Sequence, residues 1–318
     1  MILEDIPHYV GHHCSSSALK TALAYDGIEL SEALIFGLAS GLGFFYSIED
    51  KNPSRRFNGR APDLEGNFYK LIDTPLDWAK KWDLSIIEKS LENKRPLIAQ
   101  TDIFAIPYYD DSHFIGHGLL LVGLKEDAVV VADIAASNFL EMPISAFRAS
   151  VDVEHYPLLE PYHYATMPEL KSIDIKKLAP IALEKTILYM LEPPSPNEGL
   201  TGMMFFAGDL VNWADLNDSQ FVARFGYQAI EKRGTGGGNF RYLFADFLTE
   251  INSQKYKDVI FNFRYSAKLW TNLASKLKQA AFCPPAEQKE LFVAAAEIGK
   301  KIVGLETDLF NELKSLTS

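Results

Sequence analysis

One cysteine, Cys14, is placed by the sequence where its thiol could act as a nucleophile. Cys14 directly precedes residues 15–26, in which apolar residues recur at helical spacing and which a glycine follows. We therefore expect Cys14 at a helix N-terminus. Unpaired backbone N–H groups and the positive end of the helix dipole favour the reactive thiolate there.

A cysteine nucleophile needs a base, and two residues further along the chain meet that need. His117 stands at the mouth of a predicted strand, residues 118–123, and Asp133 ends the next one, residues 128–133. A short polar connection predicts that these strands pair antiparallel, which brings both residues to the same end. The order Cys, His, Asp is consistent with a nucleophilic triad. His113 is a rival base that spacing does not exclude.

Metal chemistry is not indicated around the cysteines. His12 and His13 adjoin Cys14, but adjacent side chains point apart and no carboxylate or further cysteine completes a site. Cys14 and Cys283 lie far apart and show no zinc-ligand spacing or disulfide framework. We therefore expect no bound metal or cofactor.

The elements that position these residues change in character along the chain. Helical patterns are expected over residues 15–26, 31–38 and 76–93, an irregular loop over 51–66, and strands over 96–100, 118–123 and 128–133. Helices followed by strands without βαβ alternation predict an α+β domain, residues 1–167. Beyond it, an all-helical domain is predicted over residues 168–318, with helical patterns at 176–190, 200–213, 219–231, 239–251, 258–281 and 285–316.

Composition and charge exclude several classes of protein. The 318 residues include 31 Lys and Arg against 42 Asp and Glu, a net charge of −11, with basic residues interspersed among acidic ones. Such a chain repels phosphate backbones, so nucleic acid is not an expected partner. No apolar stretch reaches the roughly 18 residues of a membrane span, and no secretory signal opens the chain. We expect a cytoplasmic protein without membrane association.

Two stretches carry a resemblance to a known family. They are Gly11-His12-His13-Cys14-Ser15-Ser16-Ser17-Ala18-Leu19, continuing to Gly41-Leu42-Gly43-Phe44, and Asp102 through Pro107-Tyr108 to His117-Gly118-Leu119-Leu120-Leu121-Val122-Gly123 and Asp133. They resemble the N-terminal domain of the butirosin biosynthesis protein H family. Residues 233–241 look like that family's companion helical domain, so the resemblance covers nearly the whole chain.

The resemblance implies a fold and an activity. Members are similar to papain-like cysteine peptidases in fold, but they transfer an acyl group from the phosphopantetheine thioester of an acyl or peptidyl carrier protein to a small-molecule amine in antibiotic biosynthesis. Cys14 is then the nucleophile, His117 the base and Asp133 the residue that orients it. Papain-like enzymes place a glutamine six residues before the cysteine, whereas this chain has His8. The candidate oxyanion or substrate-binding groups are the Cys14 backbone N–H, His8, Ser15 and Gln100.

A glycine-rich loop is the remaining candidate. Residues 234–238 precede a predicted helix beginning near Asn239, whose N-terminus could cradle a phosphate with help from Arg241. The loop follows no strand and lacks the Lys-Ser/Thr ending of a P-loop. It is either a flexible lead into the helix or, in a carrier-dependent transferase, part of the substrate channel through Gly238, Asn239 and Arg241.

Two other functions compete with acyl transfer. The same triad would serve a peptidase or thioesterase, and a non-catalytic binding protein would simply pack Cys14 in its core. A basic cluster in the predicted loop, Lys51, Arg55, Arg56 and Arg60, is either a docking patch for an acidic carrier or a solvated loop. The sequence leaves open whether the chain forms a homodimer.

Overall fold

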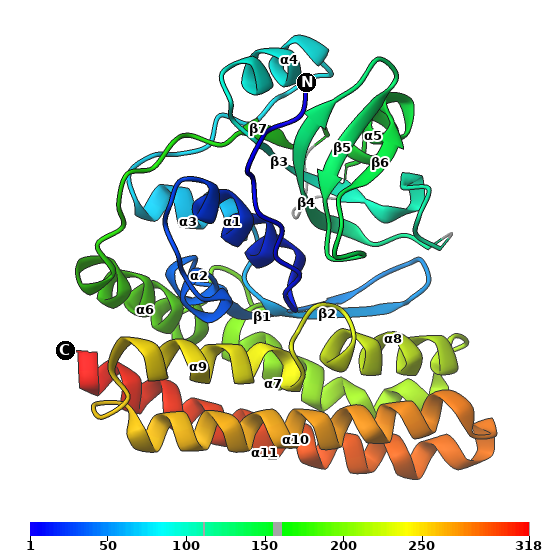
Figure 1. Cartoon of the computed structure of the whole chain (residues 1–318). Helices are drawn as coiled ribbons and strands as arrows, with labels where there is room; N and C mark the ends of the chain where they lie inside the picture. Colours follow the sequence, from blue (N-terminus) through cyan, green and yellow to red (C-terminus); the bar gives the residue numbers. More distant parts are fainter. Residues whose placement is uncertain (111, 155–160, 318) are drawn as a thin grey trace. The chain divides into compact units, whose positions relative to one another are not determined.

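Figure 1 shows the computed structural model of the chain, which describes residues 1–110, 112–154 and 161–317. The chain forms two compact units, each made from separated stretches of sequence. The first comprises Met1–Ile35 and Pro62–Asp174, and the second comprises Phe36–Ala61 and Ile175–Ser318. The sequence prediction divided the chain at residue 167 and left residues 36–61 in the first domain, whereas the structure groups them with the C-terminal helices.

The first unit is a mixed α+β structure built on one antiparallel sheet. Within the described residues its five strands run in the order β6-β5-β4-β3-β7. The strands are β3 (Leu97–Asp102), β4 (Ile115–Leu124), β5 (Ala128–Ala132), β6 (Leu140–Pro143) and β7 (Tyr164–Thr166). Leu120 pairs with Ala132 and Leu121 with Val131, so the predicted antiparallel pairing of β4 and β5 is confirmed.

Within the described part of the chain, four helices accompany this sheet, and a fifth crosses the division between the units. They are α1 (Cys14–Tyr25), α3 (Leu64–Leu71), α4 (Leu84–Glu92) and α5 (Ile144–Val151), while α2 (Glu32–Leu38) passes into the second unit. α1 packs against β4. β4 is buried along almost its whole length, as a central strand covered on both faces requires. The packing of α1 on β4 therefore sets the cysteine helix against the strand that carries His117.

The second unit combines helices with a two-stranded ribbon. All six helices predicted after residue 168 are confirmed: α6 (Ile175–Leu191), α7 (Gly199–Asp209), α8 (Ser219–Glu231), α9 (Arg241–Asn252), α10 (Lys257–Phe282) and α11 (Gln288–Thr317). Figure 1 shows the long helices α10 and α11 packed along each other. The ribbon consists of β1 (Leu42–Ile48) and β2 (Arg55–Arg60), paired antiparallel. Phe44 and Phe57 of the ribbon pack against Phe206 of α7, which explains why residues 36–61 belong with the helices.

Two sequence predictions in the N-terminal half were wrong. The expected loop at 51–66 contains β2. Arginines occupy three of its six positions and Phe57 is its only large apolar residue, so the strand lacks clear alternation of apolar and polar residues. The helix expected from residue 76 begins only at Leu84. Asp83 caps it by accepting a hydrogen bond from the Ser85 N–H, and the preceding chain is held by the Tyr164 hydroxyl instead. No helix among the described residues is long and apolar enough to cross a membrane.

Candidate active site

The loop before α1 is pinned so that Cys14 opens the helix. The Glu32 carboxylate accepts hydrogen bonds from the backbone N–H groups of His12, at 3.0 Å, and His13, at 2.6 Å. His13 is the N-cap, and its Nδ1 accepts a hydrogen bond from the backbone N–H of Ser16. Cys14 follows in the first turn and is 6% exposed. The thiol therefore lies at the helix N-terminus, as the sequence predicts.

The β4–β5 hairpin brings the expected base and carboxylate together beside that thiol. His117 Nε2 lies 3.0 Å from each oxygen of the Asp133 carboxylate. The His117 ring also hydrogen-bonds to the Cys14 side chain, which leaves Nδ1 as the nitrogen that faces sulfur. The backbone N–H of Gly118 donates to Cys14 Sγ at 3.3 Å. The structure thus assembles Cys14, His117 and Asp133 in one buried cluster.

The charges in this cluster stabilise one another. Burial alone would lower the pKa of His117, but the charge of Asp133, the hydrogen bond that His117 donates to it and the nearby Cys14 together raise that pKa above its usual value. Burial would raise the pKa of Asp133, yet the charge and hydrogen bond of His117 lower it. The stable arrangement is an imidazolium against a carboxylate. An imidazolium beside a thiol favours the thiolate.

Two tyrosines complete the surroundings of Asp133. The hydroxyl of Tyr108 donates to Asp133 Oδ2 at 2.9 Å, and that of Tyr109 donates to Oδ1 at 2.9 Å while lying 3.3 Å from His117 Nε2. Burial and the charge of Asp133 raise the pKa of both phenols, so both remain protonated donors. The backbone N–H of Ala135 adds a further bond to Oδ1. Sequence reasoning gave these tyrosines no role, because neighbouring tyrosines in a loop show no spacing that reveals their target.

The candidate oxyanion groups have different surroundings. His8 lines a narrow crevice together with Cys14 and Asp133 that is too tight to hold a water molecule, and it stacks on Phe139. Burial lowers the pKa of His8, so its ring is neutral near pH 7. Its Nδ1 is buried and has no hydrogen-bond partner among the described residues. This nitrogen makes His8 a candidate oxyanion donor, but the crevice would have to widen before a ligand could enter.

Ser15 and Gln100 are less available. Ser15 is fully buried, with its Oγ 3.9 Å from Cys14 Sγ. Gln100 lies on β3 opposite Gly118, and its amide Nε2 donates to the Glu65 carboxylate at 2.7 Å. The side chain that could mimic the papain-like glutamine is thus already engaged within the fold.

The rival base lies in a different arrangement. His113 Nδ1 is 2.6 Å from Asp102 Oδ2, and its ring stacks on Phe104. The His113 side chain is 63% exposed. Asp102 also receives the backbone N–H groups of Phe104 and Phe114. This pair joins the two ends of the loop that carries the two tyrosines. The structure therefore favours His117 as the general base for Cys14.

The glycine-rich loop and Arg241 belong to the second unit. Arg241 is fully buried, and its Nε and one terminal nitrogen hold the Glu306 carboxylate at 2.9 and 2.8 Å. Its other terminal nitrogen donates to backbone carbonyls, among them that of Asn239 at 2.8 Å. The guanidinium therefore stabilises the core of the unit instead of standing at a surface where it could meet a substrate, as the sequence had suggested.

The loop itself uses its donors internally. The N–H of Gly237 donates to the Thr235 hydroxyl, and that of Gly238 donates to Glu231 Oε1. Residues 236–240 all have positive φ, which explains the glycines, and Asn239 is fully buried. The expected phosphate cradle is not formed by these N–H groups.

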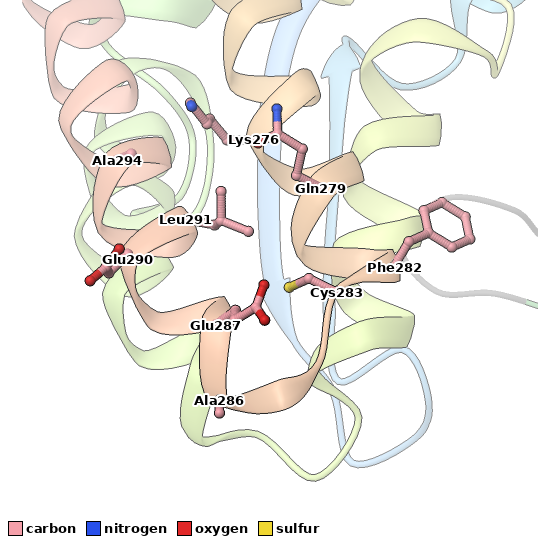
Figure 2. A pocket seen from close by; sticks show the side chains of 9 residues that line it. All are labelled: Lys276, Gln279, Phe282, Cys283, Ala286, Glu287, Glu290, Leu291 and Ala294. Carbon is pink, nitrogen blue, oxygen red and sulfur yellow. The ribbon is translucent and has the colours of Figure 1, made fainter.

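The second cysteine has different neighbours. Cys283 lies in a pocket of about 770 Å³ where α10 ends and the chain turns into α11 (Figure 2). The titratable side chains beside it are those of Lys276, Glu287 and Glu290, and no histidine lines the pocket. The described residues contain no group of three or more His, Cys, Asp or Glu side chains placed to hold a metal ion. Cys14 is therefore the cysteine with a base beside it.

Comparison with known proteins gives two matches. Residues 13–134 match the family model described as butirosin biosynthesis protein H, N-terminal, and residues 156–313 match a domain of unknown function, DUF4872. No curated protein matches the chain significantly. The first match spans Cys14, His117 and Asp133, and the second spans most of the helical unit. Residues 13–134 of this chain are therefore similar to the N-terminal domain of butirosin biosynthesis protein H.

Proposed function

We propose that this protein is a cysteine-dependent acyltransferase. It would move an acyl group from the phosphopantetheine thioester of a carrier protein to a small-molecule amine and so form an amide. The observation that carries the proposal is the buried cluster of Cys14, His117 and Asp133 at the start of α1. The family match supports a role in the biosynthesis of an antibiotic-type metabolite. The helix that begins with Cys14 packs on the antiparallel sheet that carries His117, and this packing supports a papain-like fold.

The first half of the reaction breaks the carrier thioester. The Cys14 thiolate attacks the thioester carbonyl carbon, and the tetrahedral intermediate collapses with release of the pantetheine thiolate. The His117 imidazolium gives that sulfur its proton. Cys14 is left as an acyl thioester, and the backbone N–H of Cys14 with His8 are the groups available to the oxyanion.

The second half forms the amide. His117, now neutral, takes a proton from the incoming amine as its nitrogen attacks the acyl carbon, and Cys14 leaves as a thiolate. Asp133 keeps the imidazole oriented with Nε2 towards the carboxylate, so Nδ1 faces the reacting sulfur. Cys14 and His117 are 6% and 3% exposed. Such burial limits the access of water to the acyl-enzyme and so favours transfer over hydrolysis.

The test is intact-protein mass spectrometry after mixing the full chain with an acyl-pantetheine thioester and then with a panel of amines. We expect a mass increase of one acyl group that Cys283→Ala retains and Cys14→Ala loses, and its disappearance with formation of an amide. Release of free acid at the same rate with and without amine would identify a thioesterase. No adduct, together with equal alkylation rates of Cys14 and Cys283, would identify a non-catalytic protein.

A further inference from the structure

A single carboxylate joins the two ends of the tyrosine loop, as we call the described residues 103–110 and 112–114 between β3 and β4. Asp102 is the last residue of β3 and is 3% exposed. Its Oδ1 accepts the backbone N–H groups of Phe104, at 3.2 Å, and Phe114, at 3.0 Å. Its Oδ2 lies 2.6 Å from His113 Nδ1. Asp102 therefore holds the start and the end of the loop together.

The side chains of this loop lie against the His117–Asp133 pair. Tyr108 and Tyr109 each donate a hydrogen bond of 2.9 Å to Asp133. The Tyr109 ring meets the His117 ring edge-on, with centroids 5.2 Å apart, and the Phe114 ring lies 6.4 Å from it. His117 and Asp133 are 3% and 2% exposed. The loop therefore contributes to the burial of the pair as well as to its hydrogen bonds.

Consecutive backbone turns connect Asp102 to the two tyrosines. Residues 103–105 form a short 3-10 helix whose N-cap is Asp102. The N–H of Ile106 donates to the carbonyl of Ile103 at 2.9 Å, and the N–H of Tyr109 donates to the carbonyl of Ile106 at 3.1 Å. Ile106 is 1% exposed, so this turn is anchored in the core. The position of the loop ends therefore fixes the position of the phenols.

We propose that Asp102 is a positioning residue for the reaction. It holds the tyrosine loop so that both phenols remain on Asp133, and Asp133 in turn orients His117. Asp102 contacts no reacting atom and acts through Tyr108 and Tyr109. The kinetic consequence rests on the proposed function, whereas the placement of the loop is observable without catalysis.

A carboxylate suits this position because of its number of acceptor sites. Its two oxygens can accept several hydrogen bonds at once, whereas the amide of an asparagine offers one acceptor oxygen. The backbone N–H groups of Phe104 and Phe114 would need another partner without Asp102. His113, which the sequence offered as a rival base, instead helps to secure the loop.

The first experiment follows the ring N–H proton of His117 by NMR in the full chain labelled with ¹⁵N-histidine. This proton should exchange slowly with water in the wild type, because His117 is buried against Asp133. Asp102→Ala should speed its exchange at least about tenfold, because the loop opens more often. Asp102→Asn keeps one acceptor oxygen and should have an intermediate effect.

Two further variants separate positioning from general stability. Asp83→Ala removes a carboxylate that caps α4 in the same unit and should leave the exchange rate of the His117 proton unchanged. The His113 side chain is 63% exposed, so His113→Ala should retain the circular dichroism spectrum and speed exchange less than Asp102→Ala does. If Asp102→Ala does not fold, Asp102→Asn and His113→Ala decide. Unchanged exchange in these variants, or equal acceleration in Asp83→Ala, would overturn the proposal.

The second experiment measures acyl transfer from an acyl-pantetheine thioester to an amine. Asp102→Ala should lower kcat about tenfold to hundredfold and leave the KM for the thioester unchanged, since the base is misoriented. In a chain that carries Tyr108→Phe and Tyr109→Phe, the same substitution should lower kcat much less, because the groups through which it acts are gone. An equal fall in both backgrounds would overturn the proposal. An absence of acyl transfer in the wild type would refute the proposed function and leave the NMR result to decide the role of Asp102.

Discussion

Removal of the Tyr109 hydroxyl isolates one of the donors that hold Asp133 in its charged form. In Tyr109→Phe the ring remains, while the 2.9 Å hydrogen bond to Oδ1 and the 3.3 Å contact with His117 Nε2 are lost. A hydrogen bond to a charged group contributes about 1.5–3 kcal/mol. Because Asp133 retains His117, Tyr108 and the Ala135 N–H, we expect a loss near the lower end, about 1.5 kcal/mol.

The sign of the pH dependence follows from Asp133. Its pKa in the folded protein lies below the ordinary value of 3.8, because the contributions of His117 and the two phenols exceed that of burial. A carboxyl group of this kind stabilises the fold above its unfolded pKa, and that stability is lost as the pH falls through the folded pKa. Tyr109→Phe removes one of the hydrogen bonds that lower the pKa of Asp133, so the folded pKa moves towards 3.8. The variant should therefore differ most from wild type near pH 7.

The assay is urea unfolding of wild type, Tyr109→Phe and Tyr108→Phe over a pH series. The difference in unfolding free energy should be about 1.5 kcal/mol at neutral pH and should shrink below the unfolded pKa of Asp133. Tyr69→Phe is the control, since Tyr69 is buried in the same unit and its hydroxyl makes no hydrogen bond with the described residues. A pH-independent difference in Tyr109→Phe, or the same profile in Tyr69→Phe, would refute the role of the phenol as a donor to a carboxylate.

Three further predictions concern other parts of the molecule. At mildly acidic pH, iodoacetamide should alkylate Cys14 faster than Cys283, measured by peptide mass spectrometry, and equal rates would argue against a stabilised thiolate. Asp133→Asn removes the charge that raises the pKa of His117. The acyl-transfer rate should therefore fall by about 10²–10⁴, and alkylation of Cys14 should slow near pH 6. An unchanged acyl-transfer rate would contradict the triad. Arg241→Ala leaves Glu306 buried without its partner and should cost about 3–5 kcal/mol in urea unfolding, whereas a ligand-binding role alone would leave stability intact.

The parts of the site that could be predicted from sequence depend on local structure. Cys14 was placed by a helix pattern that begins at the next residue, and His117 and Asp133 by two aliphatic runs with a short connection. Each of these patterns involves neighbours along the chain, so periodicity reports it directly. The capping of α1 by His13 and Glu32 completes the arrangement but follows from contacts between separate segments.

The parts that could not be predicted depend on contacts between residues far apart in sequence. Tyr108 and Tyr109 donate hydrogen bonds to Asp133 from a loop, and their spacing in the sequence does not indicate which carboxylate they contact. Arg241 carried a charge that suggested a ligand, but its partner Glu306 is 65 residues away and the pair is fully buried. β2 was hidden because its arginines mask the alternation that marks a strand.

The network around Asp133 also bears on how one histidine could act first as an acid and then as a base. In the resting site the Cys14 side chain is one of the groups that raise the pKa of His117, after the charge and hydrogen bond of Asp133. In the proposed reaction, acylation would convert the thiolate to a neutral thioester and so remove that contribution, while the leaving thiol would carry away the imidazolium proton. Burial lowers the pKa of His117, and only Asp133 is then left to raise it. His117 would therefore become a better base at the stage when the amine must lose its proton, and the two tyrosines keep Asp133 charged throughout.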